Sequence, residues 1–262
     1  MDRFYYIYAC VLSAIFGLCV GSFLNVVIYR LPNKMSLAVP GSHCPKCKYA
    51  LRWYDNIPVL SYLFLGGKCR KCKTHISFRY TAVELVNLLL WLLSALLFFE
   101  KSIVLACVYM IASSVFICVF FIDLEHKIIF DRFQIILLAL GVLALFFDGD
   151  YAWYSHLIGG VAGFGVFYLV ALVFEKISGK EGLGGGDIKL AGAAGLLLGW
   201  ERLLLGLLLA TIPAAIIMLI MSRGRDGEER ELPFAPYLTA GFCVSMLFGT
   251  EIIAWYLALL GF

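Results

Sequence analysis

Residues 102–122 read SIVLACVYMIASSVFICVFFI, a stretch of 21 residues without a single charged side chain. A helix needs about 20 consecutive apolar residues to cross the hydrocarbon core of a bilayer. The stretch therefore predicts a transmembrane helix, and this helix ends immediately before Asp123.

The rest of the chain has the same character. Of its 262 residues 62% are apolar and only 15% are charged, whereas about 25% of residues are charged in soluble domains. This composition excludes a water-soluble globule and a disordered chain. Seven further apolar segments bring the expected number of spans to about eight. They cover approximately residues 5–28, 82–99, 133–147, 156–174, 188–200, 203–221 and 234–262.

The first apolar segment is too long for the apolar region of a cleavable signal peptide, and no small-residue cleavage site follows it before Arg30. We therefore expect it to remain as the first span.

Basic residues are concentrated in alternate connections between the apolar segments. Eighteen of the 21 Lys and Arg lie in residues 30–79, 123–132, 176–189 and 223–230. The opposite set of ends and loops holds only three. By the positive-inside rule the basic connections face the cytoplasm and both termini face outward. Topogenic charge and attraction to lipid headgroups explain most of these residues, so the net charge of +3 does not indicate nucleic-acid binding.

One long insert interrupts the apolar pattern. It divides the chain into a first transmembrane helix (residues 1–29), a cytoplasmic loop (30–80) and a transmembrane core (81–262). The loop carries ten Lys and Arg but a single acidic residue, Asp55. The predicted fold is therefore an all-α polytopic membrane protein with about eight transmembrane helices and one cytoplasmic loop.

Two CxxC pairs in the loop predict a zinc site. The pairs Cys44-Pro-Lys-Cys47 and Cys69-Arg-Lys-Cys72 are separated by 21 residues. Each pair can present two sulfurs on one side, and two pairs complete a tetrahedron around Zn²⁺. Reduced or disulfide-bonded cysteines are the alternative, and a cytoplasmic loop disfavours disulfides. Because four thiolates leave no open coordination position, we expect the metal to stabilise the loop.

Two acidic residues stand at the ends of predicted spans. Asp123 follows residues 102–122, and Asp187 follows three glycines, Gly184 to Gly186. The predicted topology puts both carboxylates at the cytoplasmic end. Two carboxylates close together cannot both ionise at neutral pH, and such a pair activates water in aspartic proteases. A helix cap or an interfacial charge explains either residue alone, but together they predict a catalytic pair.

Other polar residues allow more than one interpretation. Glu84 lies one turn into the second predicted span, where an internal ion pair explains it as well as a catalytic role does. Asn25 is near the inner end of the first span, where Gly21 and Ser22 let another helix pack closely. Lys189 can hold a carboxylate ionised, bind a substrate carbonyl or serve as topogenic charge.

Five motifs in order resemble those of the type IV prepilin peptidase family, over nearly the whole chain. They are Gly21-Ser-Phe-Leu-Asn-Val-Val-Ile-Tyr-Arg-Leu-Pro32, the two CxxC pairs with Asn56-Ile-Pro-Val-Leu-Ser61 between them, Arg79-Tyr80 with Glu84, Ile122-Asp-Leu-Glu-His126 and Gly184-Gly-Gly-Asp-Ile-Lys189. Two departures are Ile129-Phe130-Asp131, which lacks a proline, and Leu232-Pro-Phe-Ala-Pro236, which has Ala in place of Gly.

The resemblance implies an eight-span enzyme of the bacterial inner membrane. Its catalytic residues are expected to be Asp123 and Asp187, as in presenilin-like intramembrane aspartyl proteases, with the active site facing the cytoplasm. Its expected substrates are type IV prepilins or type II secretion pseudopilins, from which it removes a basic leader peptide.

The resemblance also implies a second activity and a metal. The enzyme is expected to methylate the new N-terminal residue with S-adenosylmethionine, and the four cysteines match the family's zinc ligands. Asn25 and Glu84 match positions with polar residues in the family, and we expect the methyl donor to bind near them.

Three other functions fit parts of the sequence. A peptidase without methyltransferase activity fits all that the residues show directly. A cation-coupled transporter or channel also uses paired membrane carboxylates, but it favours carboxylates near the midplane and an inverted repeat, and the sequence shows no repeat. A zinc-dependent membrane scaffold leaves the Asp pair unexplained. The sequence does not identify the pilin, the oligomeric state or the Asp that acts as base.

Overall fold

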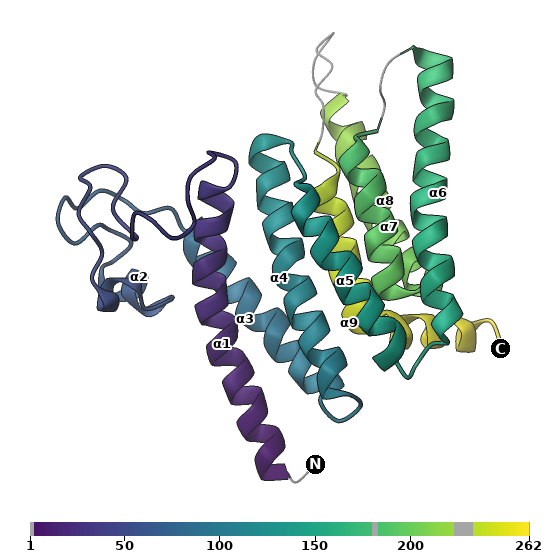
Figure 1. Ribbon diagram of the computed structural model, residues 1–262, viewed down its shortest axis with the longest axis horizontal. Coiled ribbons are helices and arrows are strands. Elements are labelled where there is room, and N and C mark those ends of the chain that lie inside the picture. The colour runs from purple at the N-terminus through teal and green to yellow at the C-terminus, as the bar shows by residue number, and fades with distance from the viewer. Residues whose placement is uncertain (1–2, 180–182, 223–232, 262) are drawn as a thin grey trace. The chain divides into compact units, whose positions relative to one another are not determined.

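The computed structural model of the chain describes residues 3–179, 183–222 and 233–261 (Figure 1). The basic stretch 223–230 lies outside these residues. Eight long helices occupy the described part, and each coincides with one of the apolar segments. They are α1 (Arg3–Arg30), α3 (Arg79–Phe98), α4 (Ile103–His126), α5 (Asp131–Phe147), α6 (Trp153–Ser178), α7 (Gly185–Leu198), α8 (Trp200–Ser222) and α9 (Ala235–Leu259).

Six of the eight helices are long and apolar enough to cross a membrane. The other two are shorter, because α5 has 17 residues and α7 has 14. The prediction of an all-α, multi-pass membrane protein is confirmed.

The chain forms two compact units, Met1–Glu100 and Lys101–Phe262. The division into residues 1–29, 30–80 and 81–262 is a finer one and stays a prediction.

In the first unit α1 packs closely on α3. A Cβ atom at Gly21 would lie 2.8 Å from the Cα of Glu84, so only glycine permits this approach. One turn earlier in α1, the carbonyl of Gly17 accepts a hydrogen bond of 2.7 Å from the side chain of Asn87. The loop between the two helices carries the four cysteines, a 3₁₀ turn (Trp53–Asn56) and the short helix α2 (Leu60–Phe64).

The second unit is built around α4. In the most apolar 18-residue stretch of α4, 72% of the residues are buried, a larger share than in any other candidate span of the described chain. Helices α6 and α7 are in backbone contact, because a Cβ on Gly159 would overlap the carbonyl oxygen of Gly195, and the reverse also holds. Glycines at this crossing let the two helix backbones touch.

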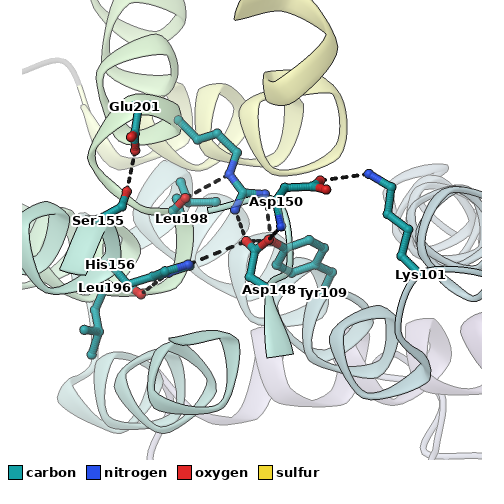
Figure 2. A network of polar contacts seen from close by, with 10 residues as sticks. Lys101, Tyr109, Asp148, Asp150, Ser155, His156, Leu196, Leu198 and Glu201 are labelled. Carbon is teal, nitrogen blue, oxygen red and sulfur yellow. Dashed lines mark hydrogen bonds and ion pairs between the residues drawn. The ribbon is translucent and has the colours of Figure 1, made fainter. Parts of the chain in front are cut away.

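A buried polar network joins four helices and the end of a fifth at one end of this unit (Figure 2). Arg202 forms an ion pair with Asp148 and donates a hydrogen bond of 2.8 Å to the hydroxyl of Tyr109. The Tyr109 hydroxyl donates in turn to Asp148, and His156 Nε2 lies 3.6 Å from the same carboxylate oxygen. Arg202 is, with Arg3 and Lys101, one of the three basic residues that the charge pattern assigns to the outer ends and loops. It is instead 1% exposed and lies inside α8.

Candidate active site and metal centre

Asp123 and Asp187 come together in the second unit, at the end remote from the Arg202 network. Asp123 is in the last turn of α4, and Tyr109 of the network lies 14 residues earlier in the same helix, a separation of about 21 Å along the helix axis. Asp187 is in the first turn of α7. The two carboxylates are near enough for their charges to interact.

The end of α4 and the start of α9 hold Asp123. The helix ends at Lys127, whose left-handed backbone (φ 54°) stops it and whose N–H donates to the Asp123 carbonyl at 2.9 Å. The Asp123 side chain is 6% exposed and accepts a hydrogen bond from the backbone N–H of Ala235. Asp123 is therefore fixed by two helix ends.

The glycine segment before Asp187 is held by α5. The side-chain amide of Gln134 donates to the carbonyl of Gly186 at 3.0 Å. A Cβ on Gly186 would lie 3.0 Å from the Cβ of Ile129, whereas Gly184 and Gly185 are exposed. Gly186 thus permits close packing, and the other two glycines leave the approach to Asp187 open.

Each carboxylate keeps one buried oxygen free. Asp123 Oδ2 and Asp187 Oδ1 have no hydrogen-bond partner among the residues that the structure describes. An unpaired buried acceptor costs about 1–3 kcal/mol, so one on each of two interacting carboxylates is a feature that stability alone does not explain.

Lys189 forms its ion pair with Asp131 and not with Asp123 or Asp187. Its Nζ forms an ion pair of 2.8 Å with Asp131, and both side chains are more than half exposed, at 52% and 68%. Of the interpretations that the sequence allowed, this contact favours a surface charge.

In the first unit the structure gathers the four cysteines. Their sulfur atoms all lie within 4.8 Å of one another, with Cys44 and Cys72 3.8 Å apart and Cys47 and Cys69 3.9 Å apart. A regular tetrahedron with Zn–S bonds of about 2.3 Å has S···S edges of about 3.8 Å. The cluster can hold a metal ion, and its dimensions fit zinc.

The two CxxC pairs adopt the same turn. In each, the N–H of the first cysteine bonds to the carbonyl five residues on, from Cys44 to Tyr49 and from Cys69 to Thr74, both at 2.9 Å. The residue after each second cysteine, a lysine, has a positive φ of 57° or 58°. Each turn therefore presents its two sulfurs in the same way.

The thiols of the cluster do not titrate alike. Hydrogen bonds from the hydroxyl and backbone of Thr74 lower the pKa of Cys72 to about 6. The backbone of Tyr49 acts to lower the pKa of Cys47, but burial and the neighbouring sulfurs raise it to about 11. A bound cation is what allows such a set to become fully ionised.

Asp55, the one acid of the loop, connects the two turns. It accepts hydrogen bonds from Arg70 Nε at 2.6 Å and from the Tyr49 hydroxyl at 3.4 Å. Burial alone raises its pKa, but these bonds and the Arg70 charge outweigh burial and leave the pKa of Asp55 lowered.

Asn25 and Glu84 lie in the first unit and bind backbone. The Asn25 amide donates to the carbonyl of Tyr80 at 3.0 Å, and Glu84 accepts from the N–H of Val59 at 2.8 Å. Glu84 also accepts from Ser22, which lines a cavity of about 360 Å³. The other lining residues are Cys19, Phe23, Val26, Arg30, Leu37, Ala38, Pro40, Gly41, Ser42, Asn56 and Pro58.

Comparison with known proteins gives a consistent result. Residues 15–98 match the bacterial peptidase A24 N-terminal domain, and residues 110–219 match the type IV leader peptidase family. Proteins named prepilin leader peptidase/N-methyltransferase are 35% identical in Aeromonas salmonicida, where the match covers 93% of this chain and 92% of the relative, and in Pseudomonas aeruginosa, where it covers 95% and 94%.

The chain belongs to the type IV leader peptidase family. A relative of the same name in Burkholderia pseudomallei is also 35% identical, over 91% of this chain and 85% of its own length. No solved structure matches the chain.

Sequence reasoning missed several residues that shape this leader peptidase. Ala235 lies in the Pro-Phe-Ala-Pro segment that was noted only as a departure, and its role depends on a backbone N–H, which no side-chain pattern reveals. Gln134 is a single amide inside an apolar segment. A polar residue in a predicted span is the signal that could have identified it.

Proposed function

We propose that the chain is a prepilin leader peptidase whose catalytic groups are Asp123 and Asp187. The observation that carries this proposal is the proximity of two acidic side chains, from the end of α4 and the start of α7, each with an oxygen that has no partner in the described part of the chain. In keeping with the names of the relatives, the substrates are type IV prepilins or pseudopilins. Cleavage takes place on the cytoplasmic side of the bacterial inner membrane, as the distribution of basic residues predicts.

The pair acts by general acid–base catalysis. One carboxylate, ionised, takes a proton from water, while the other, protonated, donates a hydrogen bond to the carbonyl oxygen of the scissile bond. The two residues titrate as a unit, so the roles belong to the pair. Gly184 and Gly185 leave room for the extended segment of substrate that this geometry requires.

Replacement of either carboxylate tests the peptidase assignment. Asp123→Asn and Asp187→Asn are each expected to abolish leader removal from a prepilin in reconstituted membranes, because the amide cannot serve as acid or base. The measurement is the ratio of cleaved to uncleaved substrate on a gel.

Asp131→Asn is the matched control, since Asp131 is an exposed carboxylate that pairs with Lys189 in the same unit. It should retain cleavage. Full cleavage by either Asp123→Asn or Asp187→Asn would refute the catalytic pair.

We further infer that the first unit binds S-adenosylmethionine for methylation of the new N-terminus. The cavity beside α1 has the size of small-molecule sites, which begin at about 300 Å³. Its wall includes Ser22, Arg30 and Asn56, and the nearby Asn25 Oδ1 is buried without a hydrogen-bond partner among the described residues. The cofactor supplies an electrophilic methyl group. The residues of the chain bind and orient it, with Glu84 holding Ser22 at the cavity wall.

Filling the cavity separates the two activities. Ala38→Trp is expected to abolish S-adenosylmethionine binding by calorimetry and methylation by mass analysis of the mature N-terminus, with cleavage intact. Met35→Trp, an exposed position outside the lining, is the control. Undiminished binding by Ala38→Trp would exclude this cavity and leave the peptidase assignment in place.

A further inference from the structure

Residues 56–67 form an uncharged segment inside the most basic part of the chain. They read NIPVLSYLFLGG, between Arg52 on one side and Lys68, Arg70, Lys71 and Lys73 on the other. The segment contains α2 and provides no ligand to the cysteine cluster. Neither the peptidase proposal nor the metal site explains why it is apolar.

The start of α2 is attached to the side of α3. Val59, its N-cap residue, donates its N–H to Glu84, the sixth residue of α3. Glu84 follows Arg79, the charged residue at which α3 begins, by five positions, a rise of about 7.5 Å. The segment is therefore held below the polar end of this span.

The same segment also lies along α1. Asn56 and Pro58 line one cavity together with Cys19 and Ser22 of α1. These two α1 residues precede Arg30, the charged last residue of the helix, by 11 and 8 positions, which corresponds to about 12–17 Å along the axis. One leaflet of the hydrocarbon core is about 15 Å thick. The cavity also reaches Arg30, so the α1 residues around the segment extend from the charged end of the helix to hydrocarbon depth, and the α3 contact lies below the charged end of that span.

The outer face of α2 is apolar and exposed. Leu60, Leu63 and Phe64 have exposed fractions of 50%, 66% and 85%, and their i, i+3, i+4 spacing puts them on one face of the helix. Such a face is costly in water but is the ordinary lipid-facing surface of an interfacial helix. At the same level, Phe23 of α1 lines the cavity and is 50% exposed.

We propose that residues 56–67 are embedded in the leaflet on the side of the cysteine loop, with Leu60, Leu63 and Phe64 in contact with lipid acyl chains. The basic residues on both flanks then lie at the level of the anionic headgroups, which attract them. The segment anchors the loop in the membrane between its two spans and gives the cavity wall a lipid-facing outer side. The proposal does not depend on the peptidase assignment.

Photo-crosslinking tests the proposal in the full-length, zinc-loaded protein. p-Benzoylphenylalanine is introduced at Phe64, and separately at Leu63, and each protein is reconstituted into vesicles of phosphatidylethanolamine and phosphatidylglycerol with oleoyl chains. After irradiation, intact-mass spectrometry detects lipid adducts, and fragmentation locates the attachment within the lipid. We expect adducts through the acyl chains at both positions.

Two control positions bracket the result. Leu89, which is 51% exposed on α3, should give acyl-chain adducts, and Ala50, exposed in the first cysteine turn, should give none. Zinc content equal to that of the parent protein shows that each variant is folded. The proposal is overturned if Leu89 forms acyl-chain adducts while positions 63 and 64 give no lipid adduct, attach only to headgroups, or crosslink only to protein.

Discussion

Asp123 and Asp148 occupy the same position in the sequence pattern, since each follows directly on an apolar segment. The structure separates them by their partners. Asp148 binds Arg202 and Tyr109 through one oxygen and the N–H of Asp150 through the other. Asp123, like Asp187, keeps an oxygen unpaired among the described residues. A buried acid with all partners in place stabilises a fold, whereas an unsatisfied one is available to a substrate.

Breaking the Asp148 ion pair tests its structural role. Asp148→Asn leaves the Arg202 guanidinium buried without its counter-charge, which should lower the free energy of unfolding by about 3–5 kcal/mol. The loss is measured as a drop in the midpoint of thermal unfolding in detergent micelles.

The double variant Asp148→Leu, Arg202→Met removes both charges, so it should be more stable than Asp148→Asn. If the single variant unfolds at the parent temperature, the ion pair does not stabilise the second unit.

At the crossing of α6 and α7 there is no room for a side chain at Gly159 or Gly195. Gly195→Ala places a methyl group on the carbonyl oxygen of Gly159, and overpacking of this kind costs about 1–3 kcal/mol. We expect a lower unfolding midpoint and reduced leader cleavage, because α7 carries Asp187 in its first turn.

Gly165→Ala is the matched control in α6, because its Cβ would have no neighbour within 4 Å among the described residues. Its midpoint should equal or exceed that of the parent. Equal stability of Gly195→Ala and Gly165→Ala would show that the close crossing is not required.

The short elements escaped prediction for a physical reason. Hydrophobic periodicity needs a window of many residues, and α2 has only five. Its start also depends on a tertiary contact, the bond from Val59 to Glu84, which joins residues 25 positions apart.

At the scale of the whole molecule, the four cysteines that can hold a metal ion all lie in the first unit. Cys47→Ser is expected to reduce zinc, measured by elemental mass spectrometry, from one ion per chain to well below that value. Trypsin should then cut more rapidly within residues 30–79, where ten basic residues lie, while cleavage of the second unit should not change, because it contains none of the four cysteines.

Cys107→Ser is the control, since this cysteine lies on the exposed side of α4. It should keep both zinc and trypsin resistance. Unchanged zinc in Cys47→Ser would contradict a four-thiolate site.

Much of this architecture could be predicted, because a transmembrane helix requires a long apolar segment that is visible in the amino-acid sequence. All eight apolar segments are helices, and cysteine spacing led directly to the cluster of four sulfurs. What the pattern could not supply were contacts between distant residues. The bond from Ala235 to Asp123, the burial of Arg202 and the bridge from Asp55 to Arg70 depend on how helices and turns pack.

Helix α7 has 14 residues and therefore rises about 21 Å, roughly 9 Å less than the thickness of the hydrocarbon core. A helix this short cannot carry its first turn to the membrane surface if its other end reaches the far side. The proposed hydrolysis consumes a water molecule at each turnover, and the exposed glycines 184 and 185 stand immediately before Asp187 on the side from which solvent would reach it. The short length of α7 therefore bears on how water would reach the proposed catalytic pair.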